Sequence, residues 1–442
     1  MKRLFDETLR AWAAAKERKP LLVRGARQVG KTYSVRKLAG GFRHFIEINF
    51  DETSEAKGLF DGALTAKTLA TKLSGWSQTP IVPGETLLFL DELQTCPNAI
   101  RSLRYFYEQM PGLHVVGAGS LLEFVLEELP SFGVGRISSR HLYPMTFREY
   151  LDAVGAGMLS ELAEKADFDH PLDSALHGKL VGHLRDYMLV GGMPAAVERF
   201  VKTGSFIEAG EVLDELVASY RDDFAKYRKR VPVARLDAVL KSVAVQAGGK
   251  FVSARVGREE KSTCILDALA LLVKAGLVHR VHASSANGQP LGAASNPSDF
   301  KAFVFDVGIQ HRLTGLDFKT FLASSDDDLV NKGALAELVV ANELVAASKS
   351  SAPAELFYWR REARNSNAEV DFVLPGAGSL VPVEVKANVR GAMQSLRAFL
   401  QAKNVARGVR TSLENFGRLP DAGIAPIYAV HRLLDGNLGE LL

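Results

Sequence analysis

The stretch GARQVGKTY has a spacing of residues that could bind a polyphosphate. Gly25, Gly30, Lys31 and Thr32 complete the pattern G-x-x-x-x-G-K-[ST]. Glycines let successive backbone N–H groups curl around phosphate oxygens, and a helix that begins directly afterwards adds a favourable dipole. A plain glycine turn is the alternative, which the apolar run LLV before the loop and the helical pattern TYSVRKLAG after it disfavour.

Each residue of this loop has an expected role toward ATP and Mg²⁺. Lys31 would bridge the β and γ phosphates, and Thr32 would ligate the magnesium ion. The set expected to contact the nucleotide is Gly25, Ala26, Arg27, Gln28, Val29, Gly30, Lys31, Thr32 and Tyr33.

Two carboxylates follow a second apolar run, TLLFLDEL, as Asp91 and Glu92. A phosphate loop predicts such a pair on a neighbouring strand, because phosphoryl transfer needs positioning and charge neutralisation more than covalent chemistry. We expect Asp91 to hold the magnesium ion and Glu92 to polarise the attacking water. Acids that merely end a strand are the alternative, which the presence of the phosphate loop disfavours.

Two further polar residues follow in the same part of the chain. Ser120 ends the run HVVGAGS, where it would orient water or sense the γ-phosphate, or else cap the next helix. In GVGRISSR, Arg136 is favoured over Arg140 as an arginine that reaches the γ-phosphate of a neighbouring subunit. A solvated surface charge is the alternative for either arginine.

A different chemistry is indicated by VPVEVKA near the end of the chain. Glu384 and Lys386 stand two apart on a strand and therefore share a face. Asp371 lies on an earlier strand, NAEVDFVLP, and Glu337 lies on a helix before it. This order is the signature of restriction-endonuclease-like nucleases, in which Glu337, Asp371 and Glu384 would bind a divalent metal and Lys386 would orient or deprotonate water. Glu369 is a less certain ligand. Half-buried strands with solvated charges, or a fold that has lost activity, are the alternatives.

The elements that position these residues follow from length and pattern. A chain of 442 residues suggests about three domains, and 47% hydrophobic with 24% charged residues indicates globular folding. Between Leu21 and Met145, strand-like runs (LLVRG, FIEINF, TLLFLDE, HVVGAGS and HLYPM) alternate with helical patterns, which predicts a parallel sheet covered by helices. Two cysteines and the lack of a long apolar run favour a cytoplasmic protein without a membrane segment.

The fold class expected is α/β, divided into four parts. They are a P-loop ATPase core at 1–146, a helical lid at 147–205, a winged helix-turn-helix domain at 206–286 and a restriction-endonuclease-like α/β domain at 298–442. The winged-helix expectation comes from three helical patterns followed by a strand in KAGLVHRVHA.

The middle part is locally basic although the whole chain has a net charge of only +3. Phe224–Ser262 holds ten Lys or Arg and three Asp or Glu, with KYRKR at 226–230 as its densest part. Phosphate contacts give sequence-independent affinity for nucleic acid, so this segment is a candidate duplex-binding surface. A solvated face or a protein-docking module is the alternative.

Five pieces together, GARQVGKT, LDE, GAGS, LYPMTFREYL and YMLVGGMP, resemble a bacterial and archaeal AAA+ ATPase family. That family carries a C-terminal domain of unknown function with a restriction-endonuclease-like (PD-(D/E)xK) fold. Many P-loop proteins share the first two pieces, whereas the last two single out the family. The resemblance implies an ATP-hydrolysing homo-oligomer, with a ring size that the sequence does not fix.

Two functions are consistent with these features. In the first, an ATP-driven machine engages nucleic acid and cuts it through the C-terminal site. In the second, the protein is an ATP-dependent assembly or switch whose inactive nuclease-like domain binds a protein partner. A protein-remodelling ATPase that does not act on nucleic acid is a third, weaker alternative.

Overall fold

The structure is a computed structural model that describes residues 1–62, 65–120, 122–128, 135–225, 230–257, 260–315, 333–361, 368–376, 378–386, 393–434 and 438. The chain divides into two compact units. The first comprises 1–143 with 349–353, and the second comprises 144–348 with 354–442. The segment expected to form a lid therefore belongs to the same compact unit as the C-terminal part.

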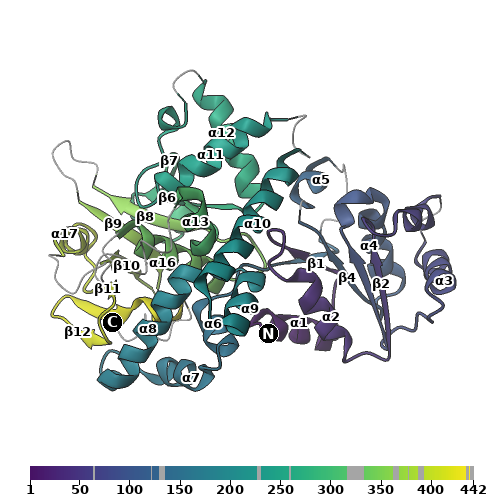
Figure 1. Ribbon diagram of the computed structural model, residues 1–442, viewed down its shortest axis with the longest axis horizontal. Helices are drawn as coiled ribbons and strands as arrows, with labels where there is room; N and C mark the ends of the chain where they lie inside the picture. Colours follow the sequence, from purple (N-terminus) through teal and green to yellow (C-terminus); the bar gives the residue numbers. More distant parts are fainter. Residues whose placement is uncertain are drawn as a thin grey trace. The chain divides into compact units, whose positions relative to one another are not determined.

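A parallel sheet of five strands, in the order β2-β3-β4-β1-β5, forms the centre of the first unit (Figure 1). Its strands are β1 (Leu21–Arg24), β2 (His44–Asn49), β3 (Thr86–Asp91), β4 (His114–Ala118) and β5 (Ser138–His141). The expected alternation of strands and helices is present. The expectation that the acidic strand neighbours the loop strand is wrong, because β4 pairs with both β1 and β3 and lies between them. The fifth strand also ends earlier than the run HLYPM suggested.

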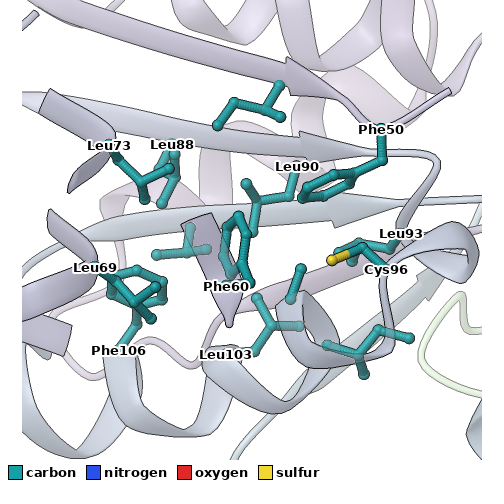
Figure 2. Packing of buried hydrophobic residues seen from close by; sticks show 14 of the residues in the cluster. Phe50, Phe60, Leu69, Leu73, Leu88, Leu90, Leu93, Cys96, Leu103 and Phe106 are labelled. Atoms are coloured by element: carbon teal, nitrogen blue, oxygen red, sulfur yellow. The ribbon is translucent and has the colours of Figure 1, made fainter. Parts of the chain in front are cut away.

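Helices and an apolar core pack against this sheet. The helices are α1 (Phe5–Ala14), α2 (Lys31–Ala39), α3 (Ala66–Ser77), α4 (Pro97–Gln109) and α5 (Leu122–Glu128), with the 3-10 helices η1 (Ser54–Phe60) and η2 (Leu93–Thr95). All six residues of β3 are buried, as expected for a parallel strand that is covered on both faces. Figure 2 shows leucine and phenylalanine side chains of β3, η1, α3 and α4 packing together, among them Leu88, Leu90, Phe60, Leu69 and Leu103.

The second unit begins with helices. They are α6 (Phe147–Ala153), α7 (Gly157–Lys165), α8 (Ser174–Val190), α9 (Pro194–Thr203), α10 (Phe206–Phe224), α11 (Val233–Val245), α12 (Ser262–Lys274), α13 (Val307–Thr314), α16 (Gly333–Ala347) and α17 (Gln394–Lys403). Thr146 and Glu149 form a reciprocal capping box that fixes the start of α6. Among the helices of the described residues, none has both the length and the apolar character that a membrane-spanning helix needs.

An eight-stranded mixed sheet completes this unit, in the order β12-β13-β11-β10-β9-β8-β6-β7. Its strands are β6 (Val278–Ser284), β7 (Ser295–Val304), β8 (Leu356–Arg360), β9 (Glu369–Pro375), β10 (Leu380–Val385), β11 (Gly408–Ser412), β12 (Gly417–Arg418) and β13 (Ala422–Pro426). Strand β6 pairs antiparallel with β7 and parallel with β8. One sheet therefore runs across the boundary expected between residues 286 and 298.

The motif GGMP, which helped to single out the family resemblance, makes close backbone contacts with two other segments of the second unit. Gly192 accepts a hydrogen bond from the backbone N of Met145 (2.7 Å), and its own N–H donates to Oδ2 of Asp306 (2.6 Å). A Cβ atom on Gly192 would collide with the carbonyl oxygen of Met145. Burial raises the pKa of Asp306 to about 6, although backbone N–H donors oppose the shift. The motif thus ties the segment before α6 to the start of α13.

We expect Phe60→Ala to destabilise the first unit by about 3–5 kcal/mol, because the substitution removes a fully buried ring. The Phe60 ring packs edge to face on Phe50, with centroids 5.4 Å apart. Trp76→Ala is the matched control, since Trp76 is 46% exposed, and should cost about 1 kcal/mol or less. Hydrogen exchange of the β3 amides measures both losses. Equal exchange in the two variants would contradict the assigned core.

Candidate active site

The loop between β1 and α2 has the strand–loop–helix form that phosphate binding requires. Gly25 has a φ of 138° and Gly30 has a φ of 100°, both in a region that strains other residues. A Cβ atom on Gly25 would also collide with the carbonyl oxygen of Leu142. Gln28 adopts a φ of 64°, so the loop contains three left-handed residues. Both glycines of the motif are therefore needed for the backbone path itself.

Lys31 is folded back onto this loop. Its Nζ donates to the carbonyl oxygens of Gly25 (3.0 Å) and Ala26 (2.7 Å). Burial lowers the pKa of Lys31 to about 8, although Glu92 and Asp91 favour its charged form. The Lys31 ammonium is thus bound by two neutral carbonyl oxygens of the loop. A charged phosphate oxygen would bind the ammonium more strongly than these carbonyl oxygens do.

Thr32 joins the loop to the acidic end of β3. Its Oγ1 donates to Oδ2 of Asp91 at 2.7 Å, across 59 residues of sequence. The other carboxylate oxygen of Asp91 accepts from the backbone N of Glu92 at 2.9 Å. The structure thus brings the hydroxyl and the carboxylate predicted to bind magnesium into direct contact.

Glu92 lies beside this pair in a left-handed conformation, with a φ of 52°. Burial raises the pKa of its carboxyl group, and the negative charge of Asp91 adds to the shift. Nε2 of Gln94 donates a hydrogen bond to Oε2 of Glu92. Oε1 of Gln94 is buried and has no hydrogen-bond partner among the described residues. Sequence reasoning missed Gln94, although its position two residues after Glu92 was a usable signal.

Ser120 and Arg136 have different surroundings. Ser120 is buried and follows β4, the strand between β1 and β3. Arg136 is 42% exposed, and its Nε forms an ion pair with Oε1 of Glu108 at 2.5 Å. The structure therefore places Ser120 at the strand end that separates the loop from the acids, and Arg136 on the surface near the end of α4. Arg140 donates to the carbonyl oxygen of Ser139 (2.8 Å).

Arg3 binds the backbone of the phosphate loop, a role that the sequence did not predict. Its Nη1 donates to the carbonyl oxygen of Val29 (2.6 Å), and its Nη2 donates to that of Tyr143 (2.7 Å). Only 3% of Arg3 is exposed. Tyr33, which was expected to contact the nucleotide, is half exposed on the first turn of α2.

A second cluster forms around Lys301 of β7. Its Nζ lies 2.7 Å from Oε1 of Glu369, 3.0 Å from Oε2 of Glu337 and 3.4 Å from Oδ1 of Asp371. Burial disfavours the charged form of Lys301, but the three carboxylates outweigh it and raise the pKa of the amine. Burial and the charge of Asp371 raise the pKa of Glu337, and Lys301 opposes this shift. The structure brings Glu337 and Asp371 together, as predicted, but around an ammonium that the sequence reasoning missed.

Glu384 and Lys386, the other two residues of the predicted nuclease set, pair with each other. Nζ of Lys386 lies 2.6 Å from Oε1 of Glu384, and the backbone N of Leu396 donates to its Oε2 at 3.0 Å. Among the residues that the structure describes, no group of three His, Cys, Asp or Glu side chains is arranged to hold a metal ion. The predicted convergence of Glu337, Asp371 and Glu384 on one ion is thus not what the geometry presents.

Most of the densest part of the predicted basic surface lies outside the described residues. Of the run KYRKR, this applies to 226–229.

Three protein-family models match the chain. Residues 17–151 match the AAA domain, 181–320 match a domain of unknown function (DUF8612) and 332–428 match a domain of unknown function (DUF4143). The expected AAA domain and the C-terminal domain of unknown function are thereby confirmed, whereas a nuclease-like fold stays a prediction. No curated protein matches the chain significantly.

Two solved structures show a distant likeness. A Walker-type ATPase of Pyrococcus abyssi is 17% identical, with a TM-score of 0.44, and the match covers 70% of this chain and 94% of that one. The Aeropyrum pernix ORC1 protein, solved in complex with DNA, is 14% identical with a TM-score of 0.27, and the match covers 73% and 95%. Both TM-scores are too low to carry a conclusion about this chain.

We expect Gly25→Ala to destabilise the first unit by about 2 kcal/mol or more, because alanine is strained at this φ and its Cβ meets a backbone oxygen. Gly75→Ala is the matched control, since a Cβ there meets no atom within 4 Å and α3 favours alanine by about 1 kcal/mol. Thermal unfolding of the two variants measures the difference. A Gly25→Ala protein as stable as Gly75→Ala would show that the loop backbone is wrongly described.

Proposed function

We propose that the first unit binds ATP with Mg²⁺ and hydrolyses it. The hydrogen bond between Thr32 and Asp91 is the observation that carries this proposal, because it closes the phosphate loop onto the acidic end of β3. The match of residues 17–151 to the AAA domain supports it. In this function the loop amides between Gly25 and Thr32 bind the β and γ phosphates of ATP.

Each side chain has a distinct role in the proposed reaction. Lys31 exchanges the carbonyl oxygens of Gly25 and Ala26 for phosphate oxygens. Thr32 and Asp91 hold the magnesium ion, which neutralises phosphate charge when bound. Glu92 polarises the attacking water, and Gln94 holds the Glu92 carboxylate until the nucleotide is in place.

Ser120 and Arg136 complete the proposed site. Ser120 orients the water or senses the γ-phosphate from the end of β4. Arg136 acts on the ATP of a neighbouring subunit in a homo-oligomer, where it stabilises transition-state charge. Its ion pair with Glu108 supports this role, because an ion pair between exposed side chains is weak and exchanges easily for a phosphate.

For the second unit we propose engagement of nucleic acid. A restriction-endonuclease-like fold is supported by the element order α16-β8-β9-β10-α17-β11. A winged-helix fold is supported by three helices, α10, α11 and α12, that are followed by the antiparallel pair β6 and β7. The basic segment Phe224–Ser262 favours engagement of nucleic acid. An interaction module for a protein partner is the alternative function.

Glu92→Gln tests the proposed hydrolysis. The variant should bind ATP with unchanged affinity but lose at least about a hundredfold in turnover, because an amide cannot polarise the water as a carboxylate does. Glu55→Gln, which changes an exposed acid of η1, is the matched control and should retain normal turnover. Phosphate release and nucleotide binding are measured on the same preparations. Normal turnover by Glu92→Gln would remove Glu92 from its proposed role.

The affinity for ATP should also fall at high pH. Lys31 has a pKa of about 8 in the nucleotide-free protein, so it is mostly neutral at pH 9, whereas phosphate binding requires its charged form. ATP binding should therefore take up a proton and weaken by about tenfold between pH 7.5 and 9. Lys31→Arg keeps its charge and should lack this dependence. Titration calorimetry in buffers of different ionisation enthalpy measures both effects, and an unchanged affinity of the wild type would contradict them.

A further inference from the structure

The acidic cluster of the second unit already contains a cation. The three N–H donors of the Lys301 ammonium face three carboxylates, those of Glu337, Glu369 and Asp371. These carboxylates come from α16 and β9, whereas Lys301 comes from β7. Only 1% of the Lys301 side chain is exposed, so the ammonium depends on these partners rather than on water.

Two of the three carboxylates expected to share a metal ion already bind a donor with each of their oxygens. Asp371 uses Oδ1 for Lys301 and accepts a hydrogen bond from the backbone N of Val385 at Oδ2 (2.8 Å). Glu384 uses Oε1 for Lys386 and accepts from the backbone N of Leu396 at Oε2. Divalent cations such as Mg²⁺ and Mn²⁺ require several free oxygen ligands. The residues present therefore do not fit the metal that a restriction-endonuclease-like site implies.

The surroundings keep Lys301 in this place. Its Nζ lies 5.4 Å from the centre of the Tyr358 ring, a favourable cation–π distance. The hydroxyl of Tyr358 in turn donates to Oδ1 of Asp299 at 2.7 Å. Asp299 also pairs with Lys250 and Arg360, so the neighbouring acid is occupied by other cations. If the Lys301 ammonium moved toward Asp299, it would thus be repelled by Lys250 and Arg360, which already pair with that carboxylate.

We infer that Lys301 takes the place of the divalent metal and that the C-terminal acidic cluster is a metal-independent site. The lysine comes from the part that matches DUF8612, and the carboxylates come from the part that matches DUF4143. The cluster thereby fastens these two parts to each other. With Lys301 in place, metal-dependent phosphodiester cleavage has no metal to use, which favours an interaction role for the second unit. This inference does not depend on ATP hydrolysis by the first unit.

Binding of Mn²⁺ to the nucleotide-free protein, measured by electron paramagnetic resonance, tests the inference. The wild type and Asp371→Asn should bind equal numbers of Mn²⁺ ions. Lys301→Met should bind one ion more than the wild type, because the substitution keeps an unbranched side chain that is one atom shorter and leaves three carboxylates without a cation. Adding Asp371→Asn to Lys301→Met should remove the gained ion. Lys250→Met is the matched control and should gain none, since Lys250 pairs with Asp299 outside the cluster.

The other outcomes are equally decisive. A wild type that binds one Mn²⁺ more than Asp371→Asn, or that nicks plasmid in a manner that Asp371→Asn abolishes, would overturn the inference. A folded Lys301→Met protein without an additional ion would overturn it as well. If Lys301→Met folds only when Mn²⁺ is added, the ion has replaced the ammonium and the inference stands. If it does not fold at all, the comparison of the wild type with Asp371→Asn decides alone.

Discussion

The hydrogen bond from Thr32 to Asp91 is the contact on which the first unit's proposed chemistry depends. It spans β4, because the strands of the loop and of the acids are not neighbours. The glycines of β4 and its exit leave room for the segment that follows the acids. A Cβ atom on Gly117 would collide with Leu93, which Figure 2 shows beside Cys96, and a Cβ atom on Gly119 would collide with Gln94. The run GAGS thus lets the segment after β3 pack closely over β4, which carries Ser120 at its end.

Two buried lysines have pKa values shifted in opposite directions because their hydrogen-bond and ion-pair partners differ. Lys31 is held by neutral carbonyls, and burial lowers its pKa to about 8, so it gains from an incoming phosphate. Lys301 is held by three carboxylates that raise its pKa, so its partners are already complete. A divalent ion about 4 Å from that ammonium would be repelled by roughly 8 kcal/mol at an effective dielectric constant near 20. An incoming anion would therefore be attracted by Lys31, whereas a second cation would be repelled by Lys301.

The sequence predicted those features that depend on local spacing. Gly25, Gly30, Lys31 and Thr32 stand at fixed intervals in the loop, and Asp91 and Glu92 come directly after the apolar run Leu87–Leu90. The order of the strands was not predictable, because β3 and β4 look equally buried and only their pairing decides which lies beside β1. Arg3 and Lys301 were missed for a related reason: each acts on segments far away in the sequence, and an isolated basic residue in an amphipathic or apolar stretch gives no sign of its partner. The motif GGMP served as a mark of resemblance, whereas its physical role is the junction between Met145 and Asp306.

The most direct test is a crystal structure of the protein with Mg²⁺ and a non-hydrolysable ATP analogue. We expect the β and γ phosphates to lie against the backbone amides of residues 25–32, the ion to contact Thr32 and Asp91, and Nζ of Lys31 to have left the carbonyl oxygens of Gly25 and Ala26. A triphosphate bound elsewhere, with Lys31 still on those two carbonyls, would contradict the central claim.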